Sequence, residues 1–253
     1  MRSRLLRKRN VWLTLVLVSA AAGVTSYVSA SFAGATTRTL RLAYNRAGRP
    51  VNPAAGEHMS IVWPVGRPLR VLFVGDSLTV GKYALGRGST FPARVTAALR
   101  ARGRVSENVR ARTGATASYW ASRPLPTADL VVIELGTNDF SVHLTPPAAF
   151  ARDYARLVAN VREASPHAQV LCLSLWRSSH YGYEGEKLLT YNQTVARECR
   201  SGAFVWISAL YDAKGARQPA GLPSFLGKTD GFHPNNTGHQ GIAEAIEQTL
   251  GLR

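Results

Sequence analysis

Short, almost wholly apolar segments alternate with helical patterns along the chain from residue 69 onward. The apolar segments are residues 69–75, 129–136, 168–176 and 204–210, with a weaker candidate at 104–110. Helical patterns cover residues 89–103, 147–164, 187–200 and 237–250. Apolar strands that alternate with helices indicate a parallel sheet covered by helices on both faces. The sequence therefore predicts an α/β fold with five parallel strands, whose chemistry lies at the carboxyl ends of the strands.

The composition is that of one globular domain with an attached segment. The chain has 253 residues, of which 45% are hydrophobic and 18% charged, so it can form one substantial core and is not a disordered chain. No internal period indicates a repeat protein. The two cysteines form no disulfide-dense scaffold, and no Cys/His cluster has the spacing of a zinc site. We expect no metal and no cofactor.

The first 33 residues have the pattern of an export segment. Residues 1–10 carry five basic side chains, and residues 11–28 carry no charge. Small residues suit cleavage after Ala30 or Ala33, yet a run of 18 apolar residues is also just long enough to span a bilayer. A cleaved signal peptide and an uncleaved membrane anchor both stay open. In either case we expect an extracytoplasmic protein, secreted or anchored.

Residues 34–68 form a stretch that contains Pro, Gly and Arg and lacks clear periodicity. We interpret it as a linker or a wrap-around arm that precedes the folded domain at residues 69–253. Residues 59–65 either add an edge strand to the sheet or pack on the domain.

The chain is strongly basic, with a formal net charge of +16. Such a field favours weak association with anionic surfaces. The basic residues are spread along the sequence, however, and no nucleic-acid-binding motif is present. We interpret the charge as a general feature of the amino-acid composition and not as a binding site. We expect a monomer with no specific nucleic-acid partner.

Unusual residues follow three of the predicted strands. Ser77 lies just past the first strand, after Gly75 and Asp76, where a tight turn exposes a nucleophile. Asn138 follows the third strand and can donate a hydrogen bond to an oxyanion. Gly114 follows the second strand and lets a backbone N–H approach a substrate. Taken singly, each is also explained by helix capping or turn chemistry.

A second group of polar residues stands near the C-terminus. Asp230 precedes His233 by three residues, and Pro234 places this segment in a loop. Asp230 can fix the imidazole tautomer and leave the other ring nitrogen of His233 free to act as a base. The alternative is a surface turn with an incidental histidine. Of the other histidines, His239 is of interest because it lies just inside the last helix.

The short motifs around Ser77, Gly114, Asn138 and Asp230–His233 occur in that order along the chain. Together they resemble the four sequence blocks of the SGNH (GDSL-type) hydrolases over about residues 69–250. The resemblance implies a three-layer α/β/α, flavodoxin-like fold with metal-free ester hydrolysis. It implies that Ser77 is the nucleophile, His233 the general base and Asp230 its orienting acid. It further implies an oxyanion hole built from the backbone N–H groups of Ser77 and Gly114 and the amide of Asn138.

The substrate is less well encoded. Four aromatic residues follow the second and fourth strands and are candidates for the rim of a substrate pocket: Trp120, Trp176, Tyr181 and Tyr183. The alternative is that they are packing residues. We expect an exported esterase that acts on small-molecule, glycan or lipid acyl esters. An acyltransferase that modifies envelope glycans and a non-catalytic envelope-binding domain are the alternatives.

The chain has two cysteines, Cys172 and Cys199. Export to an oxidising compartment favours a disulfide between them, and the helix that carries Cys199 follows the strand that carries Cys172. Two buried free thiols are the alternative. The sequence pattern does not say which face of the strand Cys172 occupies, so both possibilities stay open.

Overall fold

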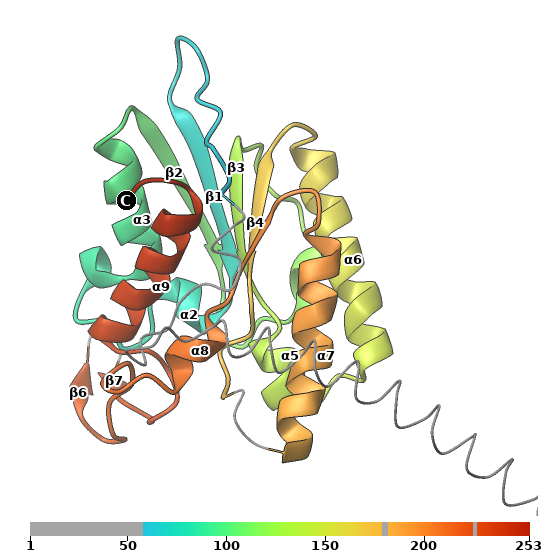
Figure 1. Cartoon of the computed structure of the whole chain (residues 1–253), viewed down its shortest axis with the longest axis vertical. Helices are drawn as coiled ribbons and strands as arrows, with labels where there is room; N and C mark the ends of the chain where they lie inside the picture. Colours follow the sequence, from blue (N-terminus) through green and yellow to red (C-terminus); the bar gives the residue numbers. More distant parts are fainter. Residues whose placement is uncertain (1–57, 179–181, 225–226) are drawn as a thin grey trace, which may run out of the picture. The chain divides into compact units, whose positions relative to one another are not determined.

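The fold centres on a five-stranded parallel sheet with the strand order β2-β1-β3-β4-β5 (Figure 1). The structure is a computed structural model that describes residues 58–178, 182–224 and 227–253. The strands are β1 (Leu69–Gly75), β2 (Val105–Ala111), β3 (Leu130–Glu134), β4 (Gln169–Leu173) and β5 (Ala203–Val205). The predicted α/β fold with helices flanking a parallel sheet is confirmed.

Helices cover both faces of the sheet and give it two hydrophobic cores. Alternate residues of β1 serve the two sides: Leu69, Val71 and Phe73 join one core, and Leu72 and Val74 join the other. The first core includes side chains of α3 (Phe91–Arg100), α8 (Ser208–Tyr211) and α9 (Asn236–Thr249). The second includes side chains of α4 (Ala117–Ala121), α5 (Thr137–Ser141), α6 (Pro147–Ala164) and α7 (Gly182–Glu198). This double burial explains the near-continuous apolar strands.

Several strands end earlier than the apolar runs suggested. The run at residues 204–210 is divided between β5 and α8, because Ser174 Oγ accepts hydrogen bonds from the backbone N–H groups of Ile207 and Ser208 at 2.8 and 2.9 Å. The third strand stops before Gly136, which takes a left-handed conformation with φ 116° at the start of α5. Continuous burial therefore extends past the strands into the turns that carry polar residues.

Several short elements fell outside the predicted pattern, α4 and α5 among them. The helix α2 (Ser77–Val80) follows β1, and a 3₁₀ turn η1 (Arg87–Ser89) precedes α3. A short hairpin pairs β6 (Pro223–Ser224) with β7 (Gly227–Lys228). These elements are too short for a periodic pattern to reveal them.

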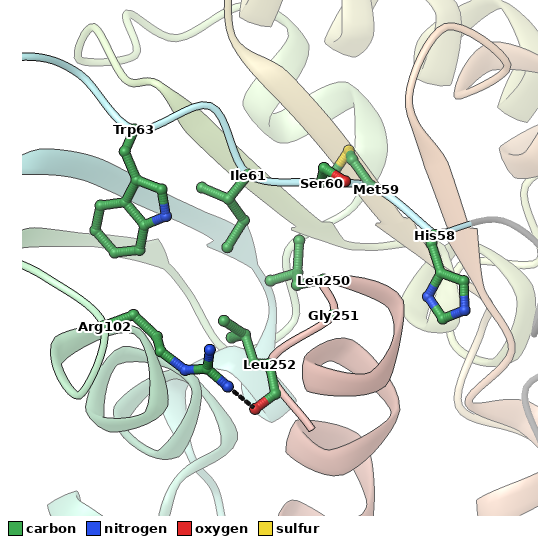
Figure 2. Close-up of a pocket in the computed structure, with 9 residues that line it drawn as sticks. All are labelled: His58, Met59, Ser60, Ile61, Trp63, Arg102, Leu250, Gly251 and Leu252. Carbon is green, nitrogen blue, oxygen red and sulfur yellow. Dashed lines mark hydrogen bonds between the residues drawn. The ribbon is translucent and has the colours of Figure 1, made fainter.

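Residues 58–68 pack on the domain without adding a strand. The backbone N–H of Met59 bonds the carbonyl of Thr249, and that of Val62 bonds Oε1 of Gln169, each at 2.8 Å. Figure 2 shows Ile61 pointing toward Leu250, just after α9, and Trp63 toward Arg102. These residues line a hollow of about 510 Å³. Of the two possibilities for residues 59–65, packing is the one that the structure adopts.

The export segment at residues 1–33 and the arm up to residue 57 lie outside the described residues. Across residues 58–178, 182–224 and 227–253, no helix combines the length and the apolar character needed to cross a bilayer.

Cys172 and Cys199 are joined in a disulfide. Cys172 lies in β4 with its side chain in the same core as α7, and Cys199 comes directly after that helix. Their Cα atoms are 6.2 Å apart, within the range that a disulfide bridges. The face of the strand that Cys172 occupies, which the sequence left open, allows the pairing.

We expect removal of this disulfide to lower the free energy of unfolding by about 3 kcal/mol in the chain-entropy model. The bridge spans 27 residues, and its loss frees the unfolded chain. The test compares urea unfolding of the wild type with that of a Cys172→Ala/Cys199→Ala variant, without reductant. The reduced wild type is the matched control, because it keeps both sulfur atoms. Equal urea midpoints for all three proteins would contradict the prediction.

Candidate active site

Ser77 lies at the first turn after β1, where the backbone approaches its neighbours closely. Asp76 caps the short helix α2 by accepting a hydrogen bond from the backbone N–H of Leu78 at 2.9 Å. A Cβ atom at Gly75 would lie 1.8 Å from Oγ1 of Thr79, so only glycine fits before this turn. The turn holds the Ser77 hydroxyl at the carboxyl end of the sheet.

The structure brings Ser77, His233 and Asp230 together although 156 residues separate the serine from the histidine. Ser77 Oγ lies 2.8 Å from Nε2 of His233, and Nδ1 of His233 lies 2.6 Å from Oδ2 of Asp230. The other carboxylate oxygen of Asp230 accepts the backbone N–H groups of Phe232 and His233 at 3.0 Å each. The aspartate thus fixes both the loop and the imidazole ring. The arrangement can transfer a proton from the serine to the histidine.

The segment after α2 links the serine turn to the histidine loop. The backbone N–H of Lys82 donates to the carbonyl of Ser77 at 3.0 Å. The carbonyl of Lys82 lies 3.2 Å from Nε2 of His239 in α9. The Lys82 ammonium lies 3.6 Å from Oδ2 of Asp230. Tyr83 has a φ of 66° and packs the edge of its ring against His233, with the centroids 5.4 Å apart. A non-glycine residue with this φ is uncommon, and here it lies beside the imidazole.

The surroundings shift the pKa values of both titratable groups. Burial lowers the pKa of His233, and the neighbouring Asp230 only partly offsets that effect. Burial raises the pKa of Asp230, but the two backbone N–H groups and His233 outweigh it and bring that pKa down to about 2. At neutral pH the histidine is therefore neutral and the aspartate ionised, as a general base and its orienting acid require.

We expect the acid limb of the kcat/KM profile to lie below pH 6.5 and to move to higher pH in a Lys82→Met variant. The Lys82 charge lowers the pKa of His233, and its removal also leaves Asp230 free to stabilise the imidazolium. The measurement is kcat/KM against pH for an ester substrate. Lys82→Arg is the matched control and should keep the limb in place, because it keeps the charge. A Lys82→Met limb at unchanged or lower pH would contradict the prediction.

Three groups at the strand ends are the expected oxyanion donors. Among the described residues, none accepts a hydrogen bond from the backbone N–H of Ser77 or Gly114, so both are open to a ligand. Gly114 has a φ of 79° at its turn. Asn138 Nδ2 lies 2.8 Å from Oδ2 of Asp76 and 3.1 Å from the carbonyl of Ala115. The amide thus connects the serine turn with the glycine turn.

Asp139 reinforces the same connection. Its Oδ2 accepts the backbone N–H of Ala117 at 3.0 Å, at the start of α4. Burial raises the pKa of Asp139 to about 6, although this N–H opposes the shift. Asn138 and Asp139, consecutive in α5, therefore hold the 114–117 segment at two points.

We expect Asn138→Ala to lower kcat by about a hundred- to a thousandfold with little change in KM, because one oxyanion donor contributes ~3 kcal/mol in the transition state alone. Steady-state kinetics on an ester substrate measures both constants. Asn160→Ala is the matched control, since that amide also donates two hydrogen bonds, in its case to two backbone carbonyls, but lies in α6. A large rise in KM with an intact kcat would instead assign Asn138 to substrate binding.

The sequence analysis missed a buried acid beneath the serine turn. Glu134 ends β3, and its Oε2 accepts the hydroxyl of Thr79 at 2.9 Å. Its Oε1 has no hydrogen-bond partner among the described residues, and burial raises its pKa well above the usual range. Burial likewise raises the pKa of Asp76. A single charged residue at the end of an otherwise apolar strand was the available signal. Within the described residues, no group of His, Cys, Asp and Glu is arranged to hold a metal ion.

Two of the aromatic residues expected at a pocket rim are buried instead. Trp120 is 8% exposed and donates its indole N–H to the carbonyl of Gly75 at 3.0 Å. Trp176 is fully buried and donates to the carbonyl of Phe232 at 2.9 Å. Both large rings fill the core, and their N–H groups brace the turns before Ser77 and His233, so the packing alternative describes them. Tyr181 lies outside the described residues, as does the side chain of Tyr183.

A parallel sheet with a serine, a histidine and an aspartate converging at its carboxyl edge defines a class of α/β hydrolase. Residues 73–240 match the GDSL-like Lipase/Acylhydrolase family, and the chain belongs to this family. The protein is accordingly a carboxylic ester hydrolase of the SGNH/GDSL type. A search of the curated proteins finds no match.

Solved structures of esterases share the fold. A family two carbohydrate esterase from Clostridium thermocellum, in complex with cellohexaose, is 23% identical with a TM-score of 0.52, covering 75% of this chain and 67% of that one. A two-domain esterase active on acetylated mannans is 20% identical with a TM-score of 0.55, covering 73% and 48%. The esterase EstA from Pseudoalteromonas sp. is 16% identical with a TM-score of 0.55, covering 72% and 96%.

Proposed function

We propose that the protein is an exported serine esterase that cleaves acyl or acetyl esters through Ser77, His233 and Asp230. The observation that carries the proposal is the continuous contact from Ser77 Oγ through the imidazole to Asp230, at 2.8 and 2.6 Å. The neutral imidazole donates its Nδ1 hydrogen to Asp230, so Nε2 accepts the proton of Ser77.

In the first half-reaction Ser77 Oγ attacks the ester carbonyl while His233 takes its proton. The imidazolium that forms is stabilised by the ionised Asp230 beside it. It then protonates the departing alkoxide, and the acyl group stays on Ser77. In the second half-reaction water repeats the attack with the same base and frees the acid and the serine.

The developing negative charge on the carbonyl oxygen is held by the N–H groups of Ser77 and Gly114 and by Asn138. Both neighbours of the Asn138 amide are hydrogen-bond acceptors in the resting protein. The bond to the Ala115 carbonyl is the longer one and is made to a neutral oxygen, so we infer that the N–H on this side is the one that also donates to the oxyanion. The charge-assisted bond to Asp76 then keeps the amide in place.

For the substrate we propose a small-molecule or glycan acyl ester in the cell envelope or the surroundings of the cell. The apolar segment at residues 11–28, after five basic side chains, supports export. Two neighbours of the same fold, a carbohydrate esterase and an esterase active on acetylated mannans, support an acetylated glycan as one substrate class.

A hydrolysis screen over p-nitrophenyl esters from acetate to palmitate tests the proposal, with acetylated polysaccharides assayed in parallel for released acetate. We expect turnover of the short acyl esters. Acyl product on an added sugar while water competes would favour the acyltransferase alternative. Failure to hydrolyse any ester, together with an unreactive Ser77, would overturn the proposal.

A further inference from the structure

The positive charge of the described domain is concentrated in one part of the chain. Residues 85–128 contain eight arginines and one acidic residue, Glu107, whereas residues 182–253 contain seven basic and seven acidic residues. Seven of the eight arginines are exposed, and we call them the arginine edge: Arg87, Arg100, Arg102, Arg104, Arg110, Arg112 and Arg123. The spread of basic residues along the sequence therefore conceals a local excess.

The topology brings these arginines to one border of the sheet. Strand β2 is the outer strand beside β1 (Figure 1). Arg104 precedes this strand, Arg110 lies in it and Arg112 follows it. Arg100 and Arg102 lie at the end of α3 and in the turn after it, and α3 contacts β2. Arg87 of η1 lines a hollow with Val109 of β2, and Arg123, after α4, shares the ring of Tyr119 with Arg112. Cations thus lie at both ends of a long, exposed outer strand.

The charges of the arginine edge are not neutralised within the described domain. None of the seven forms an ion pair with a carboxylate of a described residue. Arg102 and Arg104 donate to the carbonyls of Leu252 and Gly66, which orients them without cancelling their charge. Such an array attracts an anionic partner.

Two members of the arginine edge contact the same aromatic ring. Arg112 and Arg123 both contact the ring of Tyr119, at 4.8 and 3.5 Å from its centroid. Arg112 also donates to the tyrosine hydroxyl at 3.0 Å. Two like charges on one ring repel each other, and an anion bound nearby would relieve the repulsion.

Exposed apolar side chains lie among these cations. Val109 of β2 is 41% exposed, and Leu85, two residues before Arg87, is 67% exposed. Arg87 and Val109 line a common hollow of about 670 Å³, whose walls also include Val80, Pro92 and the segment's one acidic residue, Glu107. Basic side chains interspersed with exposed apolar ones suit a lipid surface, whereas a polyanionic glycan offers nothing to the apolar groups.

We propose that the arginine edge docks the protein on an anionic lipid bilayer, with the apolar side chains of Leu85 and Val109 entering the headgroup region. Arg112 lies two residues before Gly114, so docking would place the carboxyl end of the sheet near the lipid. The proposal does not depend on the esterase mechanism.

Site-specific fluorescence on the full chain tests the contact, because it reports docking whether or not the N-terminal segment inserts. Asn108→Cys places a thiol on the exposed outer strand, and Ala159→Cys places the matched control on α6. The disulfide leaves the new thiol as the reactive one for an environment-sensitive dye. We expect a blue shift at position 108 with vesicles that contain phosphatidylglycerol, none with pure phosphatidylcholine, and none at position 159. High salt should remove the shift.

Charge removal gives the second arm. Arg100→Gln/Arg102→Gln/Arg110→Gln should weaken the phosphatidylglycerol-dependent shift by about a hundredfold in lipid concentration, at about fivefold for each arginine. The matched control is Arg152→Gln/Arg156→Gln/Arg200→Gln, which removes the same charge from α6 and the end of α7 and should change little. Equal shifts at positions 108 and 159, no dependence on phosphatidylglycerol, or no loss in the first triple variant would overturn the proposal. A dye shift at position 108 with heparin but not with vesicles would also overturn the proposal, since the partner would then be a polyanionic glycan.

Discussion

Ser77→Ala is expected to reduce ester hydrolysis about a million-fold, to the level that the oxyanion donors and substrate binding alone can sustain. The Ser77 hydroxyl lies 2.8 Å from Nε2 of His233, the proposed base, and an alanine leaves no atom to attack the carbonyl. The measurement is kcat on the best short-chain p-nitrophenyl ester. A fluorophosphonate probe should label the wild type at Ser77, as located by peptide mass spectrometry, and should leave the variant unlabelled.

The control for this experiment is Ser106→Ala, which removes an exposed hydroxyl from β2 and should keep full activity and labelling. Unfolding curves of both variants should match the wild type within the range of conservative substitutions. Turnover by Ser77→Ala at the wild-type rate would refute the nucleophile assignment, and the rest of the mechanism with it.

Asp230→Asn is expected to lower kcat by about ten-thousandfold with the loop intact. The asparagine carbonyl can still accept the backbone N–H groups of Phe232 and His233, which hold the loop at 3.0 Å. Its amide would face Nδ1 of His233 with a donor, however, and would favour the tautomer that carries hydrogen on Nε2. That nitrogen could no longer accept the proton of Ser77.

Two observations separate this effect from misfolding. The variant should bind substrate with a similar KM, and the imidazole should titrate at a lower pH by NMR, because the charge that stabilises the imidazolium is gone. Asp153→Asn, a half-buried acid paired with Arg156 in α6, is the matched control and should leave kcat unchanged. An Asp230→Asn variant with near-normal kcat would show that the carboxylate does not orient the base.

The strands and the residues that follow them were predictable because their signals are local. A strand buried on both faces must be apolar throughout, so the runs around β1, β3 and β4 stand out from their surroundings. The parallel arrangement then requires the residues after these strands to share one edge of the sheet. For this reason Ser77, Gly114 and Asn138 could be named as candidates before any contact between them was known.

Other features depend on contacts between distant segments, and no local pattern encodes them. The indoles of Trp120 and Trp176 look the same in sequence at a pocket mouth or in a core, and only their bonds to Gly75 and Phe232 distinguish the two. The disulfide depends on which face of β4 Cys172 occupies, and the packing of α7 on one face of the sheet decides whether the two cysteines can meet. The ion pair between Lys82 and Asp230 joins residues that are 148 positions apart in the sequence.

The same division holds for charge. The sequence alone establishes how many arginines there are and that few acids lie near them between residues 85 and 128. It does not say that β2 is an outer strand, because strand order follows from how the helices cross over the sheet and not from the composition of the strand. Local patterns specify the elements and the chemistry at their ends, whereas the burial of a ring, the partner of a charge and the exposure of a strand arise only when those elements pack.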